Sequence, residues 1–214
     1  MSNYKMRKYK AVLFDMDGVI VDSMPYHFIS WFEALKKYKV TVTPLDIYEK
    51  EGEKSDSCVR RFFKRDGIKF DEKKVQDVLN LRNKIYKKYF KVFLFDDVEN
   101  VLKKLKAQNI KTAIVTGSSK QKVMAMLPKK IINLFDGIVS ADMVKRGKPH
   151  PDSYLMAAKS LNLKPSDCLV IENAPNGIKA AKSAKMFCVA VTTSLPKQYL
   201  SGADVVVPKI SKIF

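Results

Sequence analysis

The sequence predicts an α/β fold in which a mostly parallel sheet carries an inserted all-helical segment. Short apolar runs rich in Val and Ile recur after residue 110, and a helical pattern follows each of them. This alternation is typical of parallel strands whose two faces are covered by helices. One more such run lies near the N-terminus, and about 95 residues with helical patterns separate it from the others. A single crossover connection needs far fewer residues, so these helices are expected to form a separate unit.

The expected elements can be placed along the chain. Strands are predicted at residues 10–14, 111–115, 137–139, 168–171, 187–191 and 204–207. Helices are predicted in the insertion where side chains of one face recur at helical spacing, namely Met24, Phe28, Trp31, Phe32 and Leu35, then Cys58, Val59, Phe62 and Phe63, then Val75, Val78, Leu79, Arg82, Ile85 and Tyr89. The second of these helices is expected to end at Asp66, where Gly67 can supply a left-handed cap.

These elements predict a Rossmann-like core in two pieces, residues 1–22 and 94–214, with a helical cap domain at residues 23–93 between them. A chain of 214 residues is long enough for a core and a smaller inserted unit. Residues 23–26 and 91–97 would form the two linkers. Because two linkers connect the cap domain to the core, the cap could move about them as a hinge.

Composition indicates an ordinary globular chain in a reducing compartment. Apolar residues make up 46% and charged residues 29%, close to the average for globular proteins. The cysteines, Cys58, Cys168 and Cys188, are odd in number and form no CxxC pair, so we expect a cytoplasmic protein without disulfides. No apolar run approaches the roughly 20 residues of a membrane-spanning helix. Asp15 and Asp17 interrupt the one N-terminal stretch that resembles a signal peptide, and no membrane partner is expected.

The net charge is strongly positive, with 40 Lys and Arg against 22 Asp and Glu, a formal charge of +18. Such a charge attracts phosphates, nucleic acid or anionic surfaces. The lysines are spread along the whole chain and form no arm or tail, so we interpret them as a solvated surface and expect no nucleic-acid partner. A non-catalytic polyanion-binding protein is kept as the alternative from a different class. The charge predicts nothing about the oligomeric state.

Polar residues follow several of the predicted strands at the edge where ligands bind in parallel α/β sheets. After the first strand come Asp15 and Asp17, and after the second comes the stretch Thr116-Gly117-Ser118-Ser119. Two later segments also carry charged or polar side chains. They are Lys148, in Arg146-Gly147-Lys148-Pro149, and Glu172-Asn173.

These residues, in this order, resemble the four motifs of the haloacid dehalogenase superfamily of phosphatases and phosphomutases. Because the helical insertion falls between the first and second motifs, the closer resemblance is to the β-phosphoglucomutase-like branch. Four motifs in order, together with the insertion, carry far more weight than any one of them. The resemblance spans essentially the whole chain.

The resemblance implies that Asp15 is a nucleophile that forms an aspartyl-phosphate and that Asp17 is the general acid and base. Attack of a carboxylate on a phosphate monoester requires the negative charges to be masked. The resemblance assigns this masking to Lys148 and to a magnesium ion, which would be held by Asp15, the backbone carbonyl of Asp17, Glu172 and Asn173; oxygen ligands suit Mg²⁺. Thr116 and the backbone N–H groups of Gly117 and Ser118, at a helix N-terminus, would receive the phosphoryl oxygens.

Two departures from the family pattern bear on function. Asn173 stands where the family usually has a second acidic residue, so weaker metal binding is expected. His27 resembles the linker histidine of β-phosphoglucomutases, but those mutases also carry an arginine after a glycine in the cap. Here Glu53, Lys54 and Ser55 follow Gly52, and Lys54 lacks the fork of a guanidinium.

The expected function is therefore a magnesium-dependent phosphatase of small phosphorylated metabolites, sugar phosphates above all, with β-phosphoglucomutase as the alternative. His27, Lys54, Gly117 and Ser118 are the expected substrate-binding residues. Arg82 and Lys84 are further candidates for contacting a second phosphate.

Overall fold

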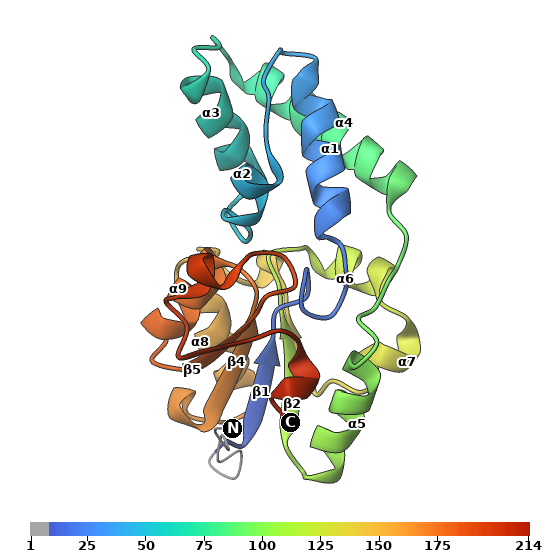
Figure 1. The fold of residues 1–214 in the computed structure, drawn as a ribbon, viewed down its shortest axis with the longest axis vertical. Coiled ribbons are helices and arrows are strands. Elements are labelled where there is room, and N and C mark those ends of the chain that lie inside the picture. The colour runs from blue at the N-terminus through green and yellow to red at the C-terminus, as the bar shows by residue number, and fades with distance from the viewer. Residues whose placement is uncertain (1–8) are drawn as a thin grey trace.

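The computed structural model describes residues 9–214 and contains a six-stranded, all-parallel sheet with the order β3-β2-β1-β4-β5-β6. Residues 1–8, which belong to the predicted first core piece, lie outside the described residues. The strands agree with those predicted and are β1 (Ala11–Phe14), β2 (Lys111–Val115), β3 (Gly137–Val139), β4 (Cys168–Glu172), β5 (Phe187–Val191) and β6 (Val205–Val207). β1 lies at the centre, with β2 and β4 as its neighbours (Figure 1).

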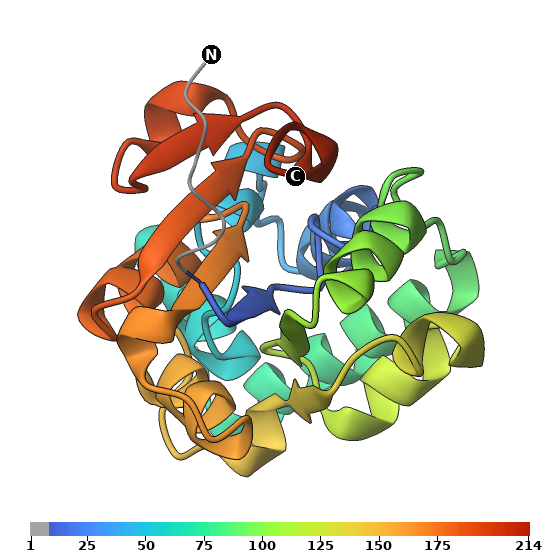
Figure 2. The same cartoon turned by 90° about the horizontal axis from the view of Figure 1, so that it is seen from below.

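Both faces of the sheet are buried because the side chains of each strand alternate between two apolar clusters. Val12 and Phe14 of β1 belong to one cluster, whereas Ala11 and Leu13 belong to the other. The first cluster is covered by α5 (Val98–Ala107), α6 (Lys120–Met126) and α7 (Lys129–Ile132), and the second by α8 (Asp152–Ser160) and α9 (Pro175–Ser183). Figure 2 shows these two sets of helices on opposite sides of the strands.

Helices α1–α4 occupy the stretch between β1 and β2 and stand beyond the carboxyl end of β1 (Figure 1). Their bounds are α1 (Met24–Lys36), α2 (Pro44–Tyr48), α3 (Ser55–Arg65) and α4 (Glu72–Tyr89). They share a third apolar cluster, in which Trp31, Phe62 and Val75 are buried. Tyr89, at the end of the third predicted pattern, is instead 46% exposed.

The connections to these helices differ in part from the prediction. α3 ends as predicted, with Gly67 in the left-handed region at a φ of 67°. α2 was not predicted; it is five residues long, and a capping box between Thr43 and Asp46 fixes its start. Residues 24–26 belong to α1 and do not form a linker. The two chain segments that join the sheet to the helices pair with each other, since Asp22 N donates to Phe93 O at 2.8 Å.

No helix within residues 9–214 is both long enough and apolar enough to cross a membrane.

Candidate active site

The sheet topology brings three of the predicted site residues together. β1, β2 and β4 are adjacent and parallel, so the residues that end or follow them meet at one edge of the sheet. Asp15 follows β1 and its N–H donates to Ile171 O of β4 at 3.0 Å. Thr116 follows β2, and Glu172 is the last residue of β4. All three side chains are buried.

Lys148 joins these carboxylates from a loop between β3 and α8. Its Nζ donates to Asp15 Oδ1 at 2.5 Å and to Glu172 Oε1 at 2.6 Å. Burial alone would lower the pKa of Lys148, but Asp15 and Glu172 outweigh it and raise that pKa, so the amine stays protonated. Burial also raises the pKa of Asp15 well above its usual value, and Lys148 opposes this effect. A protonated lysine thus lies directly beside the predicted nucleophile.

Glu172 is held from several sides. Its Oε1 also accepts a hydrogen bond from the Tyr154 hydroxyl at 2.6 Å, and its Oε2 accepts one from Asn173 N at 3.0 Å. Gly177, in the first turn of α9, leaves room for this carboxylate, because a Cβ there would lie 1.7 Å from Glu172 Oε1. Both carboxylate oxygens of Glu172, a predicted metal ligand, therefore accept hydrogen bonds from the protein. One of these bonds holds Lys148 in place.

Asp15 Oδ2 and Asn173 Oδ1, at the same edge, are among the buried oxygens without a hydrogen-bond partner among the described residues. Unpaired buried oxygens are costly unless something else binds them. The Asn173 amide is oriented by Ser194, whose Oγ accepts from Nδ2 at 2.9 Å. Within residues 9–214, no group of three or more His, Cys, Asp or Glu side chains forms a metal cluster. A carboxylate oxygen and an amide oxygen are still ligands that suit Mg²⁺, so these residues fit the predicted metal.

Asp17 lies at the centre of a second hydrogen-bonded group. Its Oδ1 accepts from Ser23 Oγ at 2.5 Å and lies 3.1 Å from His27 Nε2. Arg82 NH2 lies 2.8 Å from the other ring nitrogen, His27 Nδ1. Because a guanidinium can only donate, Nδ1 must be the acceptor, and the neutral ring then carries its proton on Nε2 toward Asp17. Burial would raise the pKa of Asp17, but the contacts with His27 and Ser23 outweigh it and lower that pKa.

The helix that follows β2 begins later than the sequence predicted. α6 begins at Lys120, with Ser119 as its N-cap, so Gly117 and Ser118 precede the helix. Ser118 N donates to Thr116 Oγ1 at 3.0 Å. The Thr116 hydroxyl proton is then free to be donated to a ligand oxygen.

The loop after α2 lies directly on this site. A Cβ on Gly52 would lie 3.0 Å from Lys148 Cβ, and a Cβ on Gly117 would lie 3.5 Å from Gly52 Cα. Gly52 also has a φ of 84°, in the region that favours glycine. The inserted helices are therefore closed against the sheet in this conformation.

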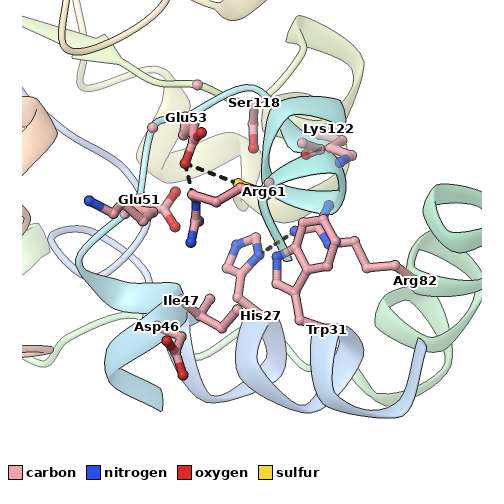
Figure 3. A pocket seen from close by; sticks show the side chains of 15 residues that line it. His27, Trp31, Asp46, Ile47, Glu51, Glu53, Arg61, Arg82, Ser118 and Lys122 are labelled. Atoms are coloured by element: carbon pink, nitrogen blue, oxygen red, sulfur yellow. Dashed lines mark hydrogen bonds and ion pairs between the residues drawn. The ribbon is translucent and has the colours of Figure 1, made fainter. Parts of the chain in front are cut away.

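A cavity of about 60 Å³ lies between these helices and the sheet edge. Figure 3 shows the side chains around it, among them His27, Glu51, Arg61, Arg82 and Lys122. Gly117 and Ser118, two of the predicted substrate-binding residues, form part of its wall. Burial lowers the pKa values of both Arg82 and Lys122.

The remaining predicted contacts lie elsewhere. Lys54 is exposed at the N-cap of α3 and lines a neighbouring hollow of about 330 Å³ with Thr116 and Lys148, not the cavity that holds His27. Lys84 is exposed on α4.

A family model described as haloacid dehalogenase-like hydrolase matches residues 12–191. The chain belongs to this family. Among curated relatives of this hydrolase, a β-phosphoglucomutase of Bacillus subtilis is 32% identical and covers 95% of this chain and 91% of its own. A validoxylamine A 7'-phosphate phosphatase of Streptomyces hygroscopicus is 29% identical over 96% of both chains. Among solved structures, a β-phosphoglucomutase from Clostridium difficile has a TM-score of 0.82 at 28% identity, covering 96% of this chain and 93% of its own. The hydrolase is thus a phosphatase or phosphomutase of the β-phosphoglucomutase-like branch.

Several site residues were missed by sequence reasoning because their roles depend on contacts across the fold. Tyr154 lies in a helix whose buried face could equally have been ordinary core, and Ser23 could have been only a helix cap. Glu51, Arg61 and Lys122 lie in segments with no motif.

Proposed function

We propose that the protein is a magnesium-dependent phosphatase of small phosphorylated metabolites, in particular sugar phosphates, and that it acts through an aspartyl-phosphate at Asp15. The observation that carries this proposal is the buried cluster in which Lys148 binds Asp15 Oδ1 and Glu172 Oε1 while Asp15 Oδ2 has no hydrogen-bond partner among the described residues. Such a cluster has no use in a protein that only binds polyanions at its surface. It suits a carboxylate that attacks a phosphate group, because the lysine offsets the repulsion between the two anions.

In the first half-reaction, an Asp15 carboxylate oxygen forms a bond to phosphorus and the bond from phosphorus to the ester oxygen breaks. Lys148 and Thr116 stabilise the phosphoryl oxygens. Asp17 delivers a proton to the leaving oxygen, since it lies two residues beyond the nucleophile at the same strand end. Entry of an anionic substrate raises the pKa of Asp17 and helps it hold that proton.

In the second half-reaction, Asp17 takes a proton from water and the water oxygen attacks the phosphorus. The bond to Asp15 breaks, inorganic phosphate leaves, and Asp17 ends protonated for the next turnover. The contacts from Ser23 and His27, which lower the pKa of Asp17, favour the ionised form that this step requires.

Magnesium would be held by Asp15 Oδ2, Asn173 Oδ1 and the backbone carbonyl of Asp17, with Glu172 close by, and would supply charge neutralisation when bound. Helices α1–α4 would act as a cap domain, residues 23–93, hinged at the paired segments around Asp22 and Phe93. The location proposed is the cytoplasm, where the free thiols of the three cysteines would persist.

β-Phosphoglucomutase is the second candidate, because His27 and Arg82 link the inserted helices to Asp17 through the contacts described above. The phosphatase is preferred because Glu51 and Glu53, on either side of Gly52, place carboxylates at the cavity. Arg61, which also lines the cavity, is already paired with Glu53.

The test is hydrolysis of p-nitrophenyl phosphate by purified protein with and without Mg²⁺. We expect turnover that excess chelator abolishes and that Asp15→Asn removes. Asp77→Asn, on the exposed side of α4, is the matched control. Turnover that survives Asp15→Asn would contradict the proposal. Phosphorus NMR on β-glucose 1-phosphate with a trace of the 1,6-bisphosphate then separates the two candidates, since glucose 6-phosphate indicates a mutase and inorganic phosphate a phosphatase.

A further inference from the structure

The cavity above the site is lined by charged groups of both signs, and several of them are paired with a neighbouring group. Glu53 accepts from Arg61 at 3.2 Å and from the Cys58 thiol at 3.4 Å. Asp46 accepts from Thr43 N at 2.8 Å. The carboxylate of Glu51, by contrast, makes no hydrogen bond or ion pair within residues 9–214. Figure 3 shows this carboxylate pointing toward the middle of the cavity.

Arg82 faces the same cavity from α4 and is also incompletely paired. Its side chain is 6% exposed, its guanidinium lies 4.7 Å from the Trp31 ring, and its NH2 contacts His27. Its Nε is buried and has no partner among the described residues. A buried guanidinium with a free donor is costly unless a ligand supplies an acceptor.

As a carboxylate, Glu51 can only accept hydrogen bonds, and Arg82 can only donate them. Burial raises the pKa of Glu51, whereas His27 and Arg82 favour its ionised form. A hydroxyl group does both, so it can donate to the carboxylate and accept from the guanidinium at once. A carboxylate or phosphate can only accept, so it can bind Arg82 but cannot bind Glu51, whose carboxylate would repel it.

We propose that Glu51 and Arg82 together recognise hydroxyl groups on the leaving part of the substrate. The site would then take phosphate monoesters of neutral sugars or polyols and discriminate against esters that carry a second anionic group at that end. This inference rests on the proposed function and deepens it. The wall shared with Gly117 and Ser118 places these hydroxyls next to the phosphoryl site.

The magnitude follows from the kind of hydrogen bond. A bond to a charged group contributes enough that its loss lowers kcat/KM by about 10- to 100-fold. Sites built around a substrate hydroxyl also reject analogues that lack it. p-Nitrophenyl phosphate has neither the hydroxyls nor a second anionic group, and it serves as the internal reference.

The experiment compares kcat/KM for glucose 6-phosphate, sorbitol 6-phosphate and phosphoglycolate, each divided by the value for p-nitrophenyl phosphate. We expect the wild-type protein to prefer at least one of the two polyol esters to phosphoglycolate. Glu51→Ala should lower the polyol ratio about 10- to 100-fold, and Glu51→Gln should raise the phosphoglycolate ratio. Glu33→Gln, on the exposed face of α1, makes the same change of net charge away from the cavity and should alter neither ratio.

Preference of the wild-type protein for phosphoglycolate would overturn the inference. So would an equal effect of the Glu51 variants on all substrates, or no effect on any. If the proposed function is wrong, the result is different: hydrolysis of p-nitrophenyl phosphate is then absent or does not depend on Asp15.

Discussion

The contact between Gly52 and Lys148 predicts that adding one methyl group to the loop above the site will impair catalysis without unfolding the protein. In Gly52→Ala the new Cβ would lie 3.0 Å from Lys148 Cβ and 3.1 Å from its Cδ. Ordinary contacts between carbon atoms are about 3.5–4.0 Å. The loop and the lysine must therefore separate by a few tenths of an ångström, up to about 0.5 Å. Lys148 is fixed by Asp15 and Glu172, so we expect the loop to move.

Gly67→Ala is the matched control. Gly67 has a φ of 67° and Gly52 one of 84°, so alanine pays a similar conformational cost of about 1–2 kcal/mol at either position. A Cβ on Gly67, however, has no atom within 4 Å. Both variants should therefore lose comparable free energy of unfolding, whereas a clash with catalytic groups arises only at Gly52.

Urea denaturation and kcat/KM for p-nitrophenyl phosphate together form the assay. Displacements of about 1 Å near reacting groups can lower rates about 100-fold. The smaller displacement here should cost Gly52→Ala roughly 10-fold in kcat/KM, and Gly67→Ala should keep it within about twofold. If both variants keep their activity while both lose stability, the closed contact has no part in catalysis and the reasoning is wrong.

Other predictions test the metal ligand, the support of Lys148 and the cavity thiol. Asn173→Asp should lower the Mg²⁺ concentration for half-maximal activity, because it adds a negative charge at an oxygen that fits the metal; an unchanged or higher concentration in a Mg²⁺ titration would contradict this. Tyr154→Phe should reduce the free energy of unfolding by about 1.5–3 kcal/mol, because it removes a buried hydrogen bond to the Glu172 carboxylate, and a loss below about 0.5 kcal/mol in urea denaturation would contradict this. Burial and Glu53 raise the pKa of Cys58 to about 12, so its thiolate fraction at pH 8 is roughly 1000-fold below that of an ordinary thiol. Iodoacetamide labelling of the native protein, read by peptide mass spectrometry, should be slow at Cys58 and should rise about tenfold per pH unit; rapid labelling at pH 8 would refute this.

The sheet was predictable because its strands are buried on both faces and read as continuous apolar runs between helical patterns. Each of the six predicted strands agrees with an observed one to within a residue at either end. Asp15, Thr116 and Glu172 could be expected near one another because residues at the carboxyl ends of parallel strands meet at one edge of the sheet.

The parts that could not be predicted depend on contacts between segments far apart in sequence. Arg82 was expected on the buried face of its helix, but its bond to His27 spans 55 residues and leaves no local pattern. Glu51 lies in a loop whose position is set by packing of the inserted helices on the sheet. α2 escaped prediction because five residues are too few to establish a helical period.

The most direct test of the central claim is detection of the covalent intermediate. Wild-type protein is mixed with substrate and Mg²⁺, quenched in acid within one turnover, and digested for mass spectrometry. We predict a phosphoryl group on Asp15, absent from Asp15→Asn and absent when chelator replaces Mg²⁺. Rapid substrate turnover with no phosphorylated Asp15 at any time point, or phosphorylation at another residue, would contradict the account.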